Sequence, residues 1–196
     1  MKVIQKYLGL IFALLVVIAL AVYPLIDGKP ATREVIFTVL RAIALASSLN
    51  IILGYTGYVS FGHIVYYGLG GYVGFYLITQ QNWSLWPSML VGGLSAGILA
   101  FLIGSAILRL RGAYFALATI GVNEAVRAFI SNFDLFGGPT GLTMNFKVYK
   151  DYGGALEALE MVFYIMIGLT IAVVVISYLV KTSKFGLGLM AIRENE

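Results

Sequence analysis

The sequence contains no cysteine and a single histidine among its 196 residues. The lack of cysteine excludes disulfide bonds and thiol chemistry, and a metal site would need mainly carboxylate ligands. Charge is also scarce, because Asp, Glu, Lys and Arg make up 11% of the chain against about 25% in ordinary globular proteins. The 13 basic residues lie scattered between apolar runs, so the net charge of +4 does not indicate a nucleic-acid-binding surface.

Hydrophobic residues make up 60% of the chain, which predicts an integral membrane protein. A hydrocarbon core about 30 Å thick takes roughly 20 helical residues, and an open sheet in lipid would leave backbone groups without hydrogen bonds. We therefore predict an all-α polytopic bundle of about six transmembrane helices, at residues 8–25, 35–53, 64–79, 86–108, 113–132 and 159–180.

The distribution of lysine and arginine predicts that both ends of the chain are cytoplasmic. With the N-terminus inside, seven basic residues near span ends fall inside and four outside, as the positive-inside rule requires. The inside set is Lys2, Lys6, Arg109, Arg111, Lys181, Lys184 and Arg193, and the outside set is Lys29, Arg33, Lys147 and Lys150.

The first predicted span has an alternative interpretation. Lys2 and Lys6, the apolar run after them and the stretch Ala19-Leu20-Ala21 also fit a cleaved signal peptide. The run at 8–25 is longer than a usual signal core, so we expect a transmembrane span.

Two patterns of glycines four residues apart, Gly70-x-x-x-Gly74 and Gly93-x-x-x-Gly97, predict close helix packing. Small residues at this spacing let two helix backbones approach each other in lipid. Packing within this one chain is the favoured interpretation, and a dedicated dimer surface is the alternative.

The stretch GYTGYVSFGH, residues 54–63, interrupts the apolar pattern between the second and third predicted spans. Its glycines weaken a helix, and its hydroxyl groups can bond to backbone that a break would free. Non-helical backbone at membrane depth is tolerated only inside protein or along a wet cavity. The segment is either a broken or re-entrant element lining a substrate path, or an ordinary cytoplasmic turn before the short third span.

Glu124 and Arg127 lie within the fifth predicted span, roughly 16 and 21 Å from its cytoplasmic start at 1.5 Å per residue. Charged groups near the midplane are expensive and usually have partners. Their spacing of three lets them pair with each other, with Asn123 adjacent. They form either a polar patch on a translocation path or a self-satisfied pair that fixes helix packing.

Four segments together resemble one protein family. They are NIILGYTGYVSFGHIVYYGLGGYVG (50–74), LRLRGAYFALATIGVNEAVR (108–127), GGPTGL (137–142) and SKFGLGLMAIRENE (183–196). In this order they resemble the LivM/LivH permeases of branched-chain amino acid ABC importers, and the LivM branch more closely. The resemblance favours the broken-element interpretation, with Gly57, Ser60 and His63 near the path beside Asn123, Glu124 and Arg127.

The resemblance implies a permease subunit without catalytic residues, metal or bound cofactor, in the cytoplasmic (inner) membrane of a prokaryote. The implied partners are two ABC ATP-binding subunits that carry ATP and Mg, a second, LivH-like permease, and a periplasmic or surface-tethered binding protein. The alternative function is an ATP-independent channel or facilitator for small polar solutes such as amides or urea. A membrane enzyme is disfavoured, because the chain shows no nucleophile and base at helix spacing.

In the family, the segment matching residues 181–196 begins the cytoplasmic loop that couples the ATPase to the permease. The resemblance assigns coupling to six residues: Phe185, Gly186, Leu189, Ile192, Arg193 and Glu194. Without it, a solvated helix end would be the expected structure. Family members continue beyond this match, so we expect one transmembrane permease domain, 1–196, that is partial relative to the family.

Overall fold

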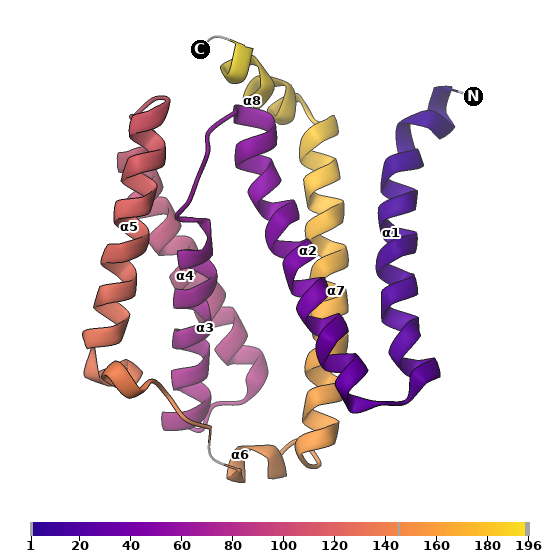
Figure 1. The fold of residues 1–196 in the computed structure, drawn as a ribbon, viewed down its shortest axis with the longest axis vertical. Coiled ribbons are helices and arrows are strands. Elements are labelled where there is room, and N and C mark those ends of the chain that lie inside the picture. The colour runs from indigo at the N-terminus through magenta and orange to yellow at the C-terminus, as the bar shows by residue number, and fades with distance from the viewer. Residues whose placement is uncertain (1, 145, 195–196) are drawn as a thin grey trace. The chain divides into compact units, whose positions relative to one another are not determined.

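The long segments of the chain are all helical, and no strand occurs among the residues that the structure describes. The computed structural model describes residues 2–144 and 146–194, with side chains at 8–144, 146 and 148–193. The long helices (Figure 1) are α1 (Lys2–Asp27), α2 (Pro30–Thr56), α3 (His63–Gln80), α4 (Leu85–Ile107), α5 (Ala113–Asn132) and α7 (Ala155–Thr182). The short ones are η1 (Asp134–Phe136), η2 (Gly138–Thr140), α6 (Lys147–Lys150) and α8 (Lys184–Glu194).

Within the described part of the chain, five helices are long and apolar enough to cross a membrane: α1, α2, α4, α5 and α7. This confirms an all-α polytopic membrane protein. The third helix of the six predicted also forms, as α3, but it is not one of the five. α3 has 18 residues, and the polar residues at its ends, His63 and Gln80, lower its mean hydropathy.

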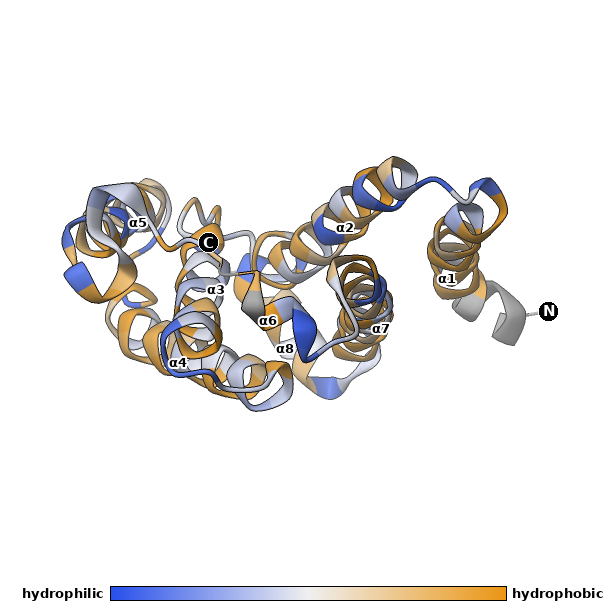
Figure 2. Ribbon diagram, turned by 90° about the horizontal axis from the view of Figure 1, so that it is seen from below, coloured by the Kyte–Doolittle hydropathy of each residue, from blue (hydrophilic) through white to orange (hydrophobic). Residues whose placement is uncertain are grey.

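Apolar side chains remain exposed around these helices, as expected of surfaces that face lipid or other membrane helices. Phe12 of α1 and Phe101 of α4 are 69% and 75% exposed. In Figure 2 the apolar residues (orange) run around α1 and α7, whereas hydrophilic residues (blue) gather in the connection between α1 and α2. The chain's own packing therefore leaves many apolar side chains of these helices uncovered, so the surroundings of the helices must be apolar.

The chain forms two compact units, one made of residues up to 57 and from 156 onward, the other of residues 58–155. The first unit contains a small core of Val17, Ile36, Leu40 and Phe163, contributed by α1, α2 and α7. Beside it, the fully buried hydroxyl of Thr170 donates to the Met166 carbonyl at 2.8 Å, with the Leu40 carbonyl at 3.3 Å. A polar contact of this kind links α7 to α2 without leaving a buried hydroxyl unpaired.

In the second unit, α3 and α4 approach backbone to backbone. A Cβ added at Gly70 would lie 3.0 Å from the Gly92 carbonyl oxygen, and one at Gly74 would lie 3.2 Å from the Ser88 carbonyl oxygen. The first glycine pattern therefore packs within the chain, as predicted. On α4 the contact is made by Ser88 and Gly92 instead of the predicted Gly93-x-x-x-Gly97.

The second pattern does not take part in this contact, because Gly93 and Gly97 occupy a different face of α4. A Cβ added at either position has no other atom of the described residues within 4 Å, beyond its chain neighbours and the adjoining helix backbone. Neighbouring residues in a helix point about 100° apart, so a shift of one position selects another face.

The GGPTGL segment forms one tight turn, η2, which follows η1 after α5. Gly137 and Gly141 have φ of 80° and 71°, the left-handed region that glycine adopts without strain. A Cβ at Gly137 would collide with the Gly141 carbonyl. Just before the turn, the ring of Phe136 packs edge-on against Tyr72 and Tyr76 of α3, with centroids 5.9 and 6.4 Å apart, and so fixes the turn to α3.

Candidate functional site

The GYTGYVSFGH segment is non-helical between Thr56, where α2 ends, and His63, where α3 begins. Gly57 ends α2 in the left-handed conformation, with φ of 79°, and its N–H donates to the Leu53 carbonyl at 3.1 Å. A left-handed glycine at this position is a common helix stop, because it lets the chain turn away and still satisfies a terminal carbonyl. The predicted interruption is therefore real.

Arg193 of α8 holds the end of α2. Its guanidinium donates a hydrogen bond of 3.1 Å to the Gly54 carbonyl, one of the last carbonyls of α2. A Cβ added at Gly57 would lie only 3.0 Å from the Arg193 Cγ. Because the C-terminal end of a helix carries partial negative charge, the cation stabilises this helix end.

α2 is also tied to α7 by Tyr55, two residues before Gly57, the first non-helical residue. The buried Tyr55 hydroxyl donates to the Ser177 carbonyl at 3.0 Å. The end of α2 is thus fixed by Tyr55 inside the helix bundle and by Arg193 at its exposed end.

The second half of the segment, residues 58–62, packs against α5 within the second unit. The N–H of Phe61 donates to the Thr119 hydroxyl at 3.1 Å, and a Cβ added at Gly62 would lie 2.9 Å from the Thr119 carbonyl oxygen. The Tyr58 ring packs against Phe115, with centroids 4.9 Å apart. The glycine at 62 is therefore needed for the close approach of two backbones.

The contact with Thr119 gives the depth of this loop along α5. Thr119 is six residues beyond Ala113, the first residue of α5, or about 9 Å along the helix axis. Residues 61 and 62 therefore lie beside the body of α5 and not at its end. Non-helical backbone beside the body of a membrane-spanning helix is what a broken element requires.

His63 and Ser60 flank this contact. His63 is the first residue of α3, and its ring lies edge-on to Tyr66, with centroids 6.5 Å apart. Both His63 and Ser60 are half-buried. Ser60 and His63 thus lie in the second unit, in and directly after the loop that packs against α5. Gly57 belongs to the first unit, which also contains Arg193.

Glu124 and Arg127 lie further along α5 and form the predicted pair, with a carboxylate oxygen 4.0 Å from a guanidinium nitrogen. Their side chains are 63% and 76% exposed on this chain, so the pair does not lie within the packing of the chain's own helices. Asn123 is half-buried and follows Thr119 by one helical turn. Thr119 and Asn123 therefore lie on one side of α5, between the loop contact and the charged pair.

α8 starts with a capped first turn against the end of α7. The Ser183 hydroxyl accepts the Gly186 N–H at 3.1 Å, and a Cβ added at Gly186 would collide with the Val180 carbonyl. Phe185 and Ile192 are 68% and 45% exposed, and Leu189 is half-buried. The side chain of Glu194, also predicted to act in coupling, lies outside the described residues.

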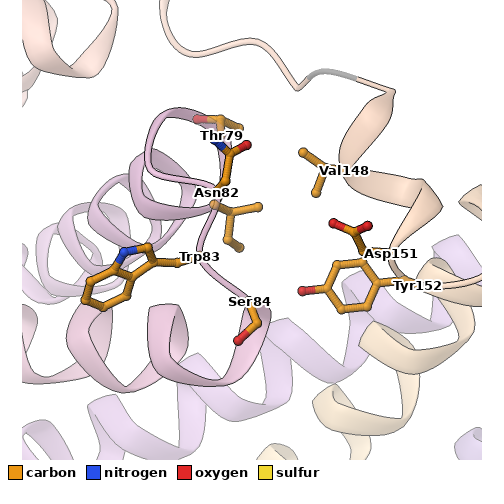
Figure 3. A pocket seen from close by; sticks show the side chains of 8 residues that line it. Thr79, Asn82, Trp83, Ser84, Val148, Asp151 and Tyr152 are labelled. Carbon is orange, nitrogen blue, oxygen red and sulfur yellow. The ribbon is translucent and has the colours of Figure 1, made fainter.

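A separate pocket of about 410 Å³ lies at the turn between α3 and α4. In Figure 3, Asn82, Trp83 and Ser84 of this turn stand opposite Val148, Asp151 and Tyr152. Asn82 has φ of 54°, and the Tyr152 hydroxyl accepts the Leu85 N–H at 2.7 Å. Among the described residues, no group of three or more His, Cys, Asp or Glu could hold a metal ion.

Sequence reasoning missed Thr119, Tyr55 and the link between Arg193 and Gly54. Tyr55 lies inside the interrupted segment itself, so its position was available as a signal, whereas nothing in the sequence places Thr119 beside that segment. The contact of Arg193 with Gly54 has no signal in the sequence, because the acceptor is a backbone carbonyl 139 residues away.

The helices and the non-helical segment define a multi-pass membrane protein with an interrupted element beside a span. The family described as "Branched-chain amino acid transport system / permease component" matches residues 31–196. The chain belongs to this family.

Two relatives agree with this assignment. The chain is 34% identical over 102 residues to the high-affinity branched-chain amino acid transport system permease protein LivM of Escherichia coli (strain K12), covering 52% of this chain and 24% of the relative. It is 32% identical over 130 residues to the protein of the same name from Salmonella typhimurium (strain LT2), covering 66% of this chain and 30% of the relative. No solved structure matches the chain.

Proposed function

We propose that this chain is the permease subunit of an ATP-binding-cassette importer that moves branched-chain or related amino acids across the cytoplasmic membrane of a prokaryote. The observation that carries the proposal is the family match over residues 31–196, which includes the interrupted segment and α8. The chain spans less than a third of each relative's length in these matches, so the activity of the whole relative is carried over as part of the proposal.

The proposed translocation path runs beside the interruption and along α5. It comprises Gly57, Ser60, His63, Asn123, Glu124 and Arg127. Its support is the position of the non-helical loop, which is held against the body of α5 by the Thr119 hydroxyl. A loop at this depth gives the path backbone groups and small polar side chains in place of an apolar helix surface.

The proposed coupling element is α8, with Phe185, Gly186, Leu189, Ile192, Arg193 and Glu194. Exposed Phe185 and Ile192 give the helix apolar side chains for a groove on an ATPase subunit. The proposed orientation has a cytoplasmic N-terminus, which puts α8 on the ATPase side. Two such ATPase subunits would hold ATP and Mg, a second, LivH-like permease would complete the membrane part, and a periplasmic or surface-tethered binding protein would deliver the amino acid.

The test is uptake of radiolabelled leucine by cells that lack their own branched-chain transport and express this chain together with its proposed partner subunits. We expect uptake that stops when an ATPase subunit is made unable to hydrolyse ATP. The matched control omits only this chain.

Uptake that continues after ATP hydrolysis is abolished, or flux of urea or a short amide without any ATPase subunit, would favour the channel alternative and refute the importer. Assembly is checked in the same cells by co-purifying the tagged chain in mild detergent. An importer subunit should bring ATPase subunits and a second permease with it.

A further inference from the structure

The predicted path and the predicted coupling helix meet at one point in the structure, where Arg193 contacts Gly54 and Gly57. Sequence reasoning had placed Gly57 in the path and Arg193 in the coupling helix. Their contact lies within one unit of the chain and joins two helix ends that are 139 residues apart in sequence.

α8 bridges α7 and α2. Its first turn is capped by Ser183 and packed against the Val180 carbonyl, at the end of α7. With 11 residues it is about 16 Å long, and Arg193 is the next-to-last of these. One end of α8 is therefore continuous with α7 through a tight, glycine-dependent turn, and the other is held to α2 by a side chain.

The two attachments differ in kind. At the Ser183 end, the closeness of Gly186 to the Val180 carbonyl leaves no room for sliding. At the Arg193 end, the link is one charge-assisted hydrogen bond in an exposed position, with the side-chain stem resting on Gly57. A tilt of α8 about Ser183 therefore acts mainly at Arg193, where the contact can shift or break.

The acceptor is suited to this role. A continuing helix would give the Gly54 carbonyl the N–H of Tyr58, but α2 ends at Thr56, so this carbonyl is left for another donor. Arg193 supplies that donor and places positive charge at the negative end of the helix dipole. Moving Arg193 away therefore changes the stability of the last turn of α2, which ends at the cap residue Gly57. Residues 58–62 follow Gly57 directly in the sequence.

We propose that Arg193 is the positioning residue that links the coupling helix to the interrupted segment, so that displacement of α8 by the ATPase subunits changes the conformation of residues 57–62. This inference rests on the proposed function. It identifies the first contact on the permease side of the coupling and assigns Gly57 to that contact as well as to the path.

The test compares Arg193→Met, Arg193→Lys and Lys150→Met in the complete transport complex reconstituted in vesicles. Leucine uptake and ATP hydrolysis are measured together. We expect Arg193→Met to lower leucine transported per ATP hydrolysed about fivefold or more, the lower end of typical coupling effects, while hydrolysis continues. Arg193→Lys should keep part of the ratio, because an ammonium can still donate to the Gly54 carbonyl. Lys150→Met, an exposed lysine of α6 outside the coupling helix, should leave the ratio unchanged.

A second measurement reports on the segment itself. The chain contains no cysteine, so Ser60→Cys gives a labelling site that is unique within this chain. We expect its labelling rate to differ between the ATP-bound and nucleotide-free complexes, and to stop responding to ATP when Arg193→Met is added. An Arg193→Met complex with an unchanged transport ratio and an unchanged labelling response would overturn the inference.

If Arg193→Met prevents assembly, Gly57→Ala displaces the Arg193 stem without removing the charge, and Gly28→Ala serves as its control. Loss of the labelling response in Gly57→Ala alone supports the inference, and an equal response in both variants overturns it. Failure of the unmodified complex to transport leucine with ATP counts against the proposed function and is seen before any Arg193 variant is compared.

Discussion

The N–H of Phe61 donates a hydrogen bond to the hydroxyl of Thr119, 58 positions away in the sequence and within the body of α5. This bond fixes the non-helical loop beside a helix long and apolar enough to cross a membrane. The Thr119 hydroxyl also donates to the Ala116 carbonyl at 2.8 Å, so the acceptor is oriented by its own helix. Thr119 thus adds a polar contact to the packing of Tyr58 on Phe115 and fixes the depth of the loop along α5.

Replacing Thr119 tests this bond. Thr119→Val keeps the side-chain shape but removes the acceptor, and we expect it to destabilise the loop by about 1 kcal/mol, the usual net contribution of one hydrogen bond. Thr119→Ser keeps the acceptor and is the matched control. The measurement is thermal unfolding in detergent together with the labelling rate of Ser60→Cys. Equal behaviour of the two variants would show that the bond does not hold the loop.

Gly57→Ala should be more harmful than Gly28→Ala. Both glycines have positive φ, 79° and 67°, so each substitution carries a left-handed strain of roughly 1–2 kcal/mol. Only Gly57 also has a close neighbour, the Arg193 stem, because a Cβ at Gly28 meets no other described atom within 4 Å. The difference in unfolding temperature between the two variants therefore measures the Arg193 contact. Adding Arg193→Ala to each variant should remove that difference.

The α3–α4 packing predicts opposite effects at adjacent residues. Gly92→Ala would put a methyl group 2.5 Å from the Gly70 carbonyl oxygen and force the two backbones apart, at a cost of about 1–3 kcal/mol. Gly93→Ala adds its methyl group in open space and should stabilise the helix by up to about 1 kcal/mol. Unfolding of the two variants in detergent checks the prediction. A loss at Gly93 comparable to the loss at Gly92 would contradict the packing described here.

The exposed residues Glu124 and Arg127 on α5 are predicted to act as an ion pair. Glu124→Ala leaves Arg127 without its counter-ion in an apolar helix, so we expect a larger loss of membrane expression and uptake than in the double variant Glu124→Ala, Arg127→Ala. The comparison is made by quantifying the chain in membranes and leucine uptake in the same cells. Independent, additive losses would mean that the two residues do not act as a pair.

The helices could be predicted because a membrane demands long apolar runs with internally paired backbone. The predicted range 113–132 coincides with α5, and the range 86–108 differs from α4 by one residue at each end. The same reasoning correctly placed the interruption between α2 and α3, since clustered glycines and hydroxyl groups are poor helix residues at any depth.

The contacts across the interruption could not be predicted in the same way. Which helix face meets a neighbour depends on geometry, and the Gly93-x-x-x-Gly97 pattern looked as suitable as the Ser88 and Gly92 face that α3 actually contacts. The Thr119 and Arg193 bonds each join a side chain to a backbone group, and a backbone group has no residue type that a sequence can reveal.

The close approach of α3 and α4 also bears on how the chain enters the membrane during synthesis. α3 is the one long helix in the described part of the chain whose mean hydropathy falls short of that expected of an independent span, whereas α4, made immediately after it, is sufficiently apolar. A segment with weak insertion free energy of its own is retained when a strongly apolar neighbour packs against it. Because glycine contacts join the two helices, we expect the hairpin of α3 and α4 to insert as one unit, with α3 depending for its place in the bilayer on residues that are synthesised after it.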